Sequence, residues 1–168
     1  GIDMGGTNTA YGIVDARGNV LAKGAIKTDN PDINAYVQEL KVELTKLIDA
    51  QGGIEKIRGI GAGCPNGNFY TGNIEFAPNL PWKGVVPFAE LISDAFGVPA
   101  AVTNDANAAA IGEMTYGVAR GMKNFITITL GTGVGSGIVI DGKIVYGNDG
   151  FAGELGHTTM RRNNGRLC

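Results

Sequence analysis

The sequence has 168 residues, a formal net charge of −2 and no long basic run, so nucleic acid is not indicated as its main partner. No apolar run approaches the roughly 20 residues that a membrane-spanning helix needs, which argues against a membrane partner. The two cysteines, Cys64 and Cys168, are too few for a disulfide framework and indicate a reducing, cytoplasmic location.

The first 27 residues predict three antiparallel strands joined by turns. The first turn is rich in glycine, and the segment Asp3–Thr7 reads Asp-Met-Gly-Gly-Thr. Asp3 could hold a hydrated Mg²⁺, a cation that prefers oxygen ligands. Gly5, Gly6 and Thr7 could offer N–H and hydroxyl donors to a phosphate. The segment is not a Walker loop, because no Gly-Lys-Ser/Thr follows it.

The middle of the chain predicts helices that alternate with strands. Asp32 is expected to cap a helix that ends at residues 51–53, because apolar residues recur there at helical spacing. The elements expected next are a strand over 57–63, a hairpin over 69–77 around a turn at 71–73, a helix over 87–96 and a strand over 99–103. Asn104 or Asp105 then caps an alanine-rich helix that ends near residues 116–117.

A second glycine-rich stretch, Gly131–Gly137, lies between strands expected over 125–130 and 138–140. Glycine at this density lets the backbone approach a ligand and turn its N–H groups toward an anion such as phosphate. A tight glycine hairpin without a ligand is the alternative. Asp141-Gly142 predicts a hairpin turn before a strand over 143–146. Two such glycine turns suggest two clamps on one polyphosphate.

The order of these elements indicates an α/β fold with a mixed sheet. A break near residues 117–121 divides the chain into a first domain, 1–117, and the incomplete start of a second domain, 118–168. The second glycine hairpin echoes the first, as expected if two domains share one fold. The sequence begins within a strand and stops after a polar loop, so we expect both ends to be clipped from a longer protein.

Asn104 and Asp105 come directly after a predicted strand, at the start of a helix. A carboxylate in this place can accept a proton from a substrate hydroxyl while the helix N-terminus holds it. The alternative is that Asn104 and Asp105 only cap the helix, since these residue types are common caps. The two roles are compatible.

The only histidine, His157, follows Glu154 by three residues, so the two share a face on a helical turn. Both could bond hydroxyls of one polyol; the alternative is a surface loop with a hydrogen-bonded histidine. His157 and Cys168 would supply half of the four ligands that a structural zinc needs. Cys64 is expected to be a small buried residue rather than a nucleophile.

Taken in order, these stretches resemble the ROK family (repressors, open reading frames and sugar kinases) of the hexokinase–actin–Hsp70 superfamily. The resemblance covers the whole chain and implies a ribonuclease-H-like fold. Its stretches are Asp3–Thr7, Gly61–Pro65, Ala77–Trp82, Asn104–Glu113, Leu130–Gly137 and Gly150–His157. One departure is Asn66, where many members have glycine, so the shape of the sugar-side loop stays open.

The resemblance implies that Asp105 is the catalytic base of a sugar kinase. It implies a sugar site made of Gly63, Pro65, Asn79, Asn104, Asp105, Glu154 and His157. It implies two phosphate loops, made of Asp3, Gly5, Gly6 and Thr7 and of Gly131, Thr132 and Gly133. It also implies a structural zinc site that includes His157 and Cys168, the latter as the first cysteine of a Cys-x-Cys-Gly-x-x-Gly-Cys motif.

The function implied is that of a glucokinase, which uses ATP and Mg²⁺ to phosphorylate the 6-hydroxyl of glucose and forms a homodimer when full-length. The family also holds sugar-sensing repressors without kinase activity and kinases for other hexoses, such as fructose or N-acetylmannosamine, so both stay open. Polyphosphate in place of ATP stays open too. The adenine half and the remaining zinc ligands would lie beyond residue 168, so the 168-residue chain alone is expected to be inactive.

Overall fold

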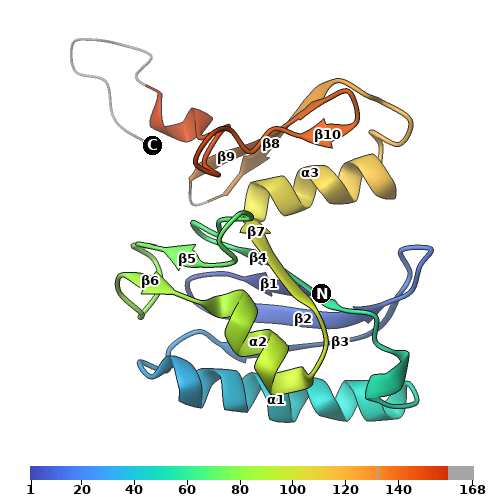
Figure 1. Cartoon of the computed structure of the whole chain (residues 1–168). Helices are drawn as coiled ribbons and strands as arrows, with labels where there is room; N and C mark the ends of the chain where they lie inside the picture. The colour runs from blue at the N-terminus through green and yellow to red at the C-terminus, as the bar shows by residue number, and fades with distance from the viewer. Residues whose placement is uncertain (132, 159–168) are drawn as a thin grey trace. The chain divides into compact units, whose positions relative to one another are not determined.

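The computed structural model describes residues 1–131 and 133–158, and the chain divides into two compact units, Gly1–Asp105 and Ala106–Cys168 (Figure 1). The division falls at the start of a helix, whereas the sequence places the start of the second domain at residue 118. Compactness and domain identity are different properties, so the domains 1–117 and 118–168 stay a prediction.

The first unit contains a five-stranded sheet with the strand order β3-β2-β1-β4-β7. The antiparallel strands β1, β2 and β3 are neighbours, and β4 is parallel to both β1 and β7. The mixed sheet and the three antiparallel strands predicted at the start of the chain are therefore confirmed. The strands are β1 (Ile2–Met4), β2 (Asn8–Val14), β3 (Val20–Lys27), β4 (Ile60–Cys64) and β7 (Ala100–Asn104).

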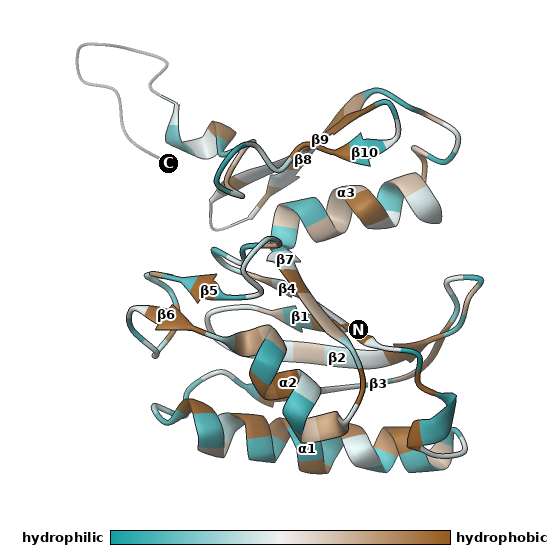
Figure 2. Ribbon diagram, viewed as in Figure 1, coloured by the Kyte–Doolittle hydropathy of each residue, from teal (hydrophilic) through white to brown (hydrophobic). Residues whose placement is uncertain are grey.

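Helices α1 (Ile33–Ala50) and α2 (Phe88–Phe96) contact each other and pack on this sheet. Figure 2 shows apolar residues recurring along α1 between polar ones. The recurring apolar residues are buried, and burying one side chain of this size stabilises a fold by about 1.5–3 kcal/mol. Alternate strand residues such as Ile2 and Met4 complete the core. The buried residues of α1 are Tyr36, Val37, Leu40, Leu44 and Ile48.

The ends of both helices follow the sequence signals. The Asp32 carboxylate accepts hydrogen bonds from the backbone N–H groups of Asn34 (2.8 Å) and Ala35 (3.3 Å), which would otherwise lack partners. At the other end of α1 the chain turns through Gln51 into a short 3₁₀ turn, Ile54–Lys56. Helix α2 ends at Gly97, whose φ of 69° lies in the left-handed region that glycine adopts without strain.

A buried group of hydroxyls joins α1 to the sheet. The Tyr36 hydroxyl lies 2.5 Å from Thr9 Oγ1, which lies 2.9 Å from Thr28 Oγ1. Burial raises the pKa of Tyr36 to about 12, so the phenol stays neutral. The Trp82 ring packs on Tyr36 with centroids 4.7 Å apart, and its indole N–H donates to the Asn30 carbonyl at 3.1 Å. The loop that carries Trp82 is thereby fixed to α1.

The hairpin predicted over 69–77 is wrong. Strand β5 (Ile74–Glu75) pairs with β6 (Val85–Val86), which lies beyond the proline-rich loop. Phe76 adopts a positive φ of 53° and ends β5, and its N–H donates to the Gly84 carbonyl at 2.7 Å. The glycine turn at residues 71–73 is present, but it joins residues 66–68 to residues 73–75. Gly67 and Ile74 form an isolated bridge, and the Asn68 N–H donates to the Asn73 carbonyl at 2.8 Å.

The second unit contains a three-stranded antiparallel sheet, β10-β9-β8, and nearly all of helix α3 (Asp105–Thr115). Its strands are β8 (Phe125–Leu130), β9 (Val134–Ile140) and β10 (Lys143–Ile144), and a 3₁₀ turn, η2 (Leu155–His157), follows. The predicted Asp-Gly turn joins β9 to β10, with positive φ at Asp141 and Gly142. Along residues 1–131 and 133–158, none of the helices combines the length and apolar character needed to cross a membrane.

Replacing Asp32 by alanine removes the acceptor for two N–H groups of α1, and we expect the free energy of unfolding to fall by about 1 kcal/mol. Asp49→Ala is a matched control at the exposed C-terminal end of the same helix. It should leave stability unchanged or raise it slightly, because an acidic group is unfavourable there. Denaturant titration followed by circular dichroism measures both changes, and equal losses would contradict the capping role.

Candidate functional site

The carboxyl ends of three parallel strands, β1, β4 and β7, lie side by side in the first unit. Asp3 pairs with Gly63, Gly63 pairs with Thr103, and Cys64 pairs with Asn104. The first glycine turn follows β1, Pro65 follows β4, and Asp105 follows β7 as the first residue of α3. Ligands of α/β folds commonly bind at such an edge. The sheet register thus brings together residues that the sequence singled out in three separate segments.

The first glycine turn closes the β1–β2 hairpin. The Gly5 N–H donates to the Asn8 carbonyl at 2.9 Å, and the Thr28 N–H donates to the Thr7 carbonyl at 2.9 Å. Asp3 is exposed between the buried residues that flank it, so its carboxylate lies on the sheet face opposite the helices. A carboxylate beside a glycine turn fits the proposed Mg²⁺ and phosphate. The Gly5 N–H is used inside the turn, so N–H donors for a phosphate would come from Gly6 and Thr7.

Gly6 has a structural constraint that sequence reasoning missed. A Cβ added at Gly6 would lie 2.8 Å from the Asn79 carbonyl oxygen, which is closer than real Cβ atoms come, and 3.3 Å from Asn79 Cβ, which is a tight contact. The glycine turn and the loop over residues 77–82 therefore touch at this point. A candidate phosphate residue and a candidate sugar residue are neighbours, and only glycine allows their approach.

The Cys64 thiol is influenced by two carboxylates at this edge. Burial raises the pKa of the Cys64 thiol, and the negative charges of Asp105 and then Asp3 raise it further. Both carboxylates therefore lie within electrostatic reach of the end of β4. Cys64 is fully buried, with 0% of its surface exposed, so the prediction of a small buried residue is confirmed.

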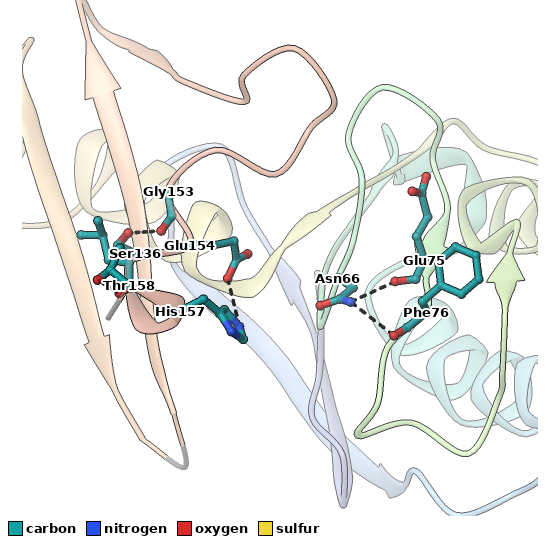
Figure 3. Close-up of polar contacts among 9 residues, drawn as sticks. Asn66, Glu75, Phe76, Ser136, Gly153, Glu154, His157 and Thr158 are labelled. Carbon is teal, nitrogen blue, oxygen red and sulfur yellow. Dashed lines mark hydrogen bonds and ion pairs between the residues drawn. The ribbon is translucent and has the colours of Figure 1, made fainter. Parts of the chain in front are cut away.

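The loop after β4 is held by Asn66. This residue has a positive φ of 51°, a conformation that asparagine tolerates better than most residues and glycine adopts freely. Its side-chain amide donates to the carbonyls of Glu75 (2.9 Å) and Phe76 (3.4 Å), as Figure 3 shows. The requirement for positive φ explains how asparagine can stand where the family resemblance leads us to expect glycine, and the side-chain amide adds two hydrogen bonds that hold the loop.

Asn104 is the last residue of β7 and Asp105 is the first residue of α3. Asn104 is half-buried and Asp105 is exposed. The predicted strand-to-helix junction is therefore confirmed. The role of Asp105, as a catalytic base or as a helix cap, stays a prediction.

The second glycine stretch divides into two parts with different surroundings. Gly131 and Gly133 are exposed in the turn between β8 and β9, where the Gly131 N–H donates to the Gly133 carbonyl at 3.0 Å. No described atom lies within 4 Å of a Cβ built on either residue, so a ligand could approach. A Cβ at Gly135 or Gly137 would instead clash with Ala106 or Ala110 of α3. Those glycines allow helix packing. Thr132 lies outside the described residues.

In the second unit Glu154 precedes η2 and His157 is its last residue, and the two side chains share a face as predicted. Glu154 Oε2 lies 3.9 Å from His157 Nε2, and the His157 side chain is 77% exposed (Figure 3). Cys168 lies outside the described residues, and among the described ones no three His, Cys, Asp or Glu side chains cluster as metal ligands. The zinc site with His157 and Cys168 therefore stays a prediction.

The family model for the ROK family matches residues 1–168. The chain belongs to the ROK family. It is 40% identical over 169 residues to a curated glucokinase from Streptomyces coelicolor, covering 100% of this chain and 51% of the relative. A xylose repressor from Caldicellulosiruptor bescii is 41% identical over 105 residues, which is 62% of this chain and 26% of the repressor.

Among solved structures, a ROK family glucokinase from Streptomyces griseus in complex with glucose and AMPPNP matches with a TM-score of 0.82 and 34% identity. The match covers 96% of this chain and 50% of that one. The chain thus spans about half the length of these ROK family glucokinases. The family resemblance and fold class seen in the sequence are confirmed.

Replacing Gly6 by alanine should force the Asn79 loop away from the first glycine turn, and we expect the free energy of unfolding to fall by about 1–3 kcal/mol. Gly61→Ala is the matched control, because a Cβ at Gly61 meets no described atom within 4 Å. That change should be neutral or stabilising by about 0.5–1 kcal/mol. Thermal unfolding of both variants measures the difference, and an unchanged melting temperature for Gly6→Ala would argue against the contact.

Proposed function

We propose that the protein is a ROK sugar kinase that transfers the γ-phosphoryl group of ATP to the 6-hydroxyl of glucose. The observation that carries this proposal is the shared sheet edge at which the first glycine turn follows β1 and Asp105 follows β7, the two parallel strands on either side of β4. The edge supplies N–H donors for an anion and a carboxylate for a hydroxyl proton. The similarity to glucokinases, one of them solved with glucose and AMPPNP, supports the choice of substrates.

Each candidate residue has a chemical role in this proposal. Asp105 accepts the proton of the sugar hydroxyl as the hydroxyl oxygen forms its bond to the γ-phosphorus and the bond to the ADP oxygen breaks. Asp3 holds Mg²⁺, which neutralises charge on the phosphates when bound. The phosphates are bound by Gly5, Gly6, Thr7, Gly131, Thr132 and Gly133. The sugar is bound by Gly63, Pro65, Asn79, Asn104, Glu154 and His157.

Catalysis in this proposal rests mainly on positioning and electrostatics. Holding two reactants in line can contribute about 7–11 kcal/mol to lowering a barrier. The residues that hold the reactants lie on strand ends and on turns fixed to them, such as the Asn79 loop against Gly6. A structural zinc held by His157, Cys168 and further ligands of the whole protein would order the η2 region and take no part in the reaction. We also propose that the whole protein forms a homodimer and is located in the cytoplasm.

A sugar-sensing transcriptional regulator is the second candidate, and the similarity to a xylose repressor favours it. The intact Asp3–Thr7 turn favours the kinase, since a regulator has no need of a phosphate-binding loop. Another hexose, such as fructose or N-acetylmannosamine, and polyphosphate as donor are variants of the kinase proposal. ATP turnover by the whole protein over a panel of sugars separates these possibilities.

Asp105→Asn keeps the size and hydrogen bonding of the side chain and removes the proton acceptor. We expect kcat in the whole protein to fall on the order of 10²–10⁴-fold. Stability should change by about 1 kcal/mol or less, because Asn104 can share the helix cap. Steady-state kinetics and thermal unfolding measure the two effects. Asp94→Asn, an exposed position on α2, is the control and should alter neither.

Near-normal turnover of Asp105→Asn with a much lower melting temperature would support capping and overturn the catalytic role. Absence of sugar phosphorylation by the wild-type protein, together with tight sugar binding, would favour the regulator.

Glu154→Ala removes a carboxylate that we assign to sugar hydroxyls. The KM for sugar should rise by about tenfold or more, because a site built to bond a hydroxyl loses a partner for it. The KM for ATP should stay nearly unchanged. Glu90→Ala, on the exposed face of α2, is the control. If the KM for ATP rises and that for sugar does not, Glu154 belongs to the nucleotide side.

A further inference from the structure

Strand β9 presents different neighbours on its two faces. Gly135 pairs with Thr129 and Gly137 pairs with Thr127, so these four residues share one face of the sheet. Helix α3 packs on that face, because a Cβ at Gly137 would lie 2.8 Å from the Ala106 carbonyl oxygen. The glycines of β9 therefore leave room for α3 to pack closely on this face. The side chains of the residues between them point to the opposite face of the sheet.

The opposite face of β9 carries Val134, Ser136 and Ile138, and the segment 153–157, which includes η2, lies on it. A Cβ at Gly153 would lie 3.1 Å from the Ser136 carbonyl oxygen, and one at Gly156 would clash with the Val134 carbonyl. Side chains at either glycine would push the segment off the strand. This segment carries Glu154 and His157, the two candidate sugar residues of the second unit.

One side-chain hydrogen bond ties the segment to the strand. Ser136 is 4% exposed, and its hydroxyl donates to the Gly153 carbonyl, as Figure 3 shows. The same carbonyl accepts the Leu155 N–H at 2.8 Å, which begins η2. The His157 N–H then donates to the Glu154 carbonyl at 3.1 Å. A chain of bonds therefore runs from Ser136 through Gly153 to the residues that bear the carboxylate and the imidazole.

The segment 153–157 needs a hydrogen bond to the strand to hold it in one conformation. Gly147, Gly150 and Gly153 all have positive φ, between 76° and 93°, and glycine loses more conformational entropy on ordering than other residues. The His157 side chain is largely exposed, so its own packing contributes little to fixing η2. A buried hydroxyl on a sheet strand is a rigid point from which the turn can be held.

The hydroxyl of Ser136 is poorly suited to bind phosphate, although it lies in the glycine-rich stretch that suggests a phosphate clamp. A serine hydroxyl has one proton to donate. That proton is directed to the Gly153 carbonyl. Only acceptor capacity remains on the oxygen, and an anion needs donors.

We infer that Ser136 is a positioning residue for Glu154 and His157, which it holds through the Gly153 carbonyl. Its part in sugar binding rests on the proposed function. Its part in ordering the segment does not.

Ser136→Ala tests the inference in the whole protein, with Ser93→Ala on α2 as the matched control for the same substitution in the first unit. Hydrogen exchange is followed at the amides of Leu155, His157 and Thr158. Exchange at these amides should be about three- to tenfold faster in Ser136→Ala, the size expected for one lost hydrogen bond, and unchanged in Ser93→Ala. Unchanged exchange in both variants would overturn the inference, whatever the enzyme activity.

Kinetics give the second readout. In Ser136→Ala the KM for glucose should rise about three- to tenfold while the KM for ATP stays constant. The rise should become smaller when Ser136→Ala is combined with Glu154→Ala, because the part of the effect that acts through Glu154 is lost and only the part that acts through His157 remains. A rise in the KM for ATP instead, or full additivity with Glu154→Ala, would overturn the positioning role. If the wild-type protein phosphorylates no sugar, the proposed function fails and the exchange measurement alone decides.

Discussion

The parallel pairing of β4 with β1 and β7 is the constraint on which the first unit depends. It aligns Asp3, Gly63 and Thr103 in one row and makes Cys64 and Asn104 neighbours at the sheet edge. Residues that lie in three distant segments of the sequence become adjacent because parallel strands end on the same side. A shift of one residue in this register would turn every side chain to the other face, so the apolar residues of β4 that pack under the helices also fix the edge.

Most elements could be predicted from local sequence signals. The apolar spacing of α1, its Asp32 cap, the Gly97 stop of α2 and the Asp-Gly turn after β9 all act over a few residues, and the structure agrees with each. The prediction of a hairpin over 69–77 was wrong because the pairing of a strand depends on partners that are distant in the sequence. Nothing near Ile74 indicates that its partner is Val86, beyond a loop that is held by the contact of Trp82 with Tyr36 of α1.

The candidate site shows the same division between local and long-range information. The high density of glycine predicted the two turns, but the sequence did not reveal which close contact each glycine allows. Gly6 allows the Asn79 loop to approach, whereas Gly137 allows α3 to approach. Alternation along β9 is the signal that could have found Ser136, because a polar residue between two glycines of a strand must face away from whatever the glycines pack against.

The buried thiol at the end of β4 has a consequence for redox behaviour. Oxidants attack the thiolate, and Cys64 is held in its protonated form by burial and by the carboxylates of Asp105 and Asp3. A cysteine at the centre of the sheet edge is thus protected by its neighbours from peroxide and from disulfide exchange as long as the fold is intact. Cys64 therefore becomes open to oxidation only when the first unit unfolds.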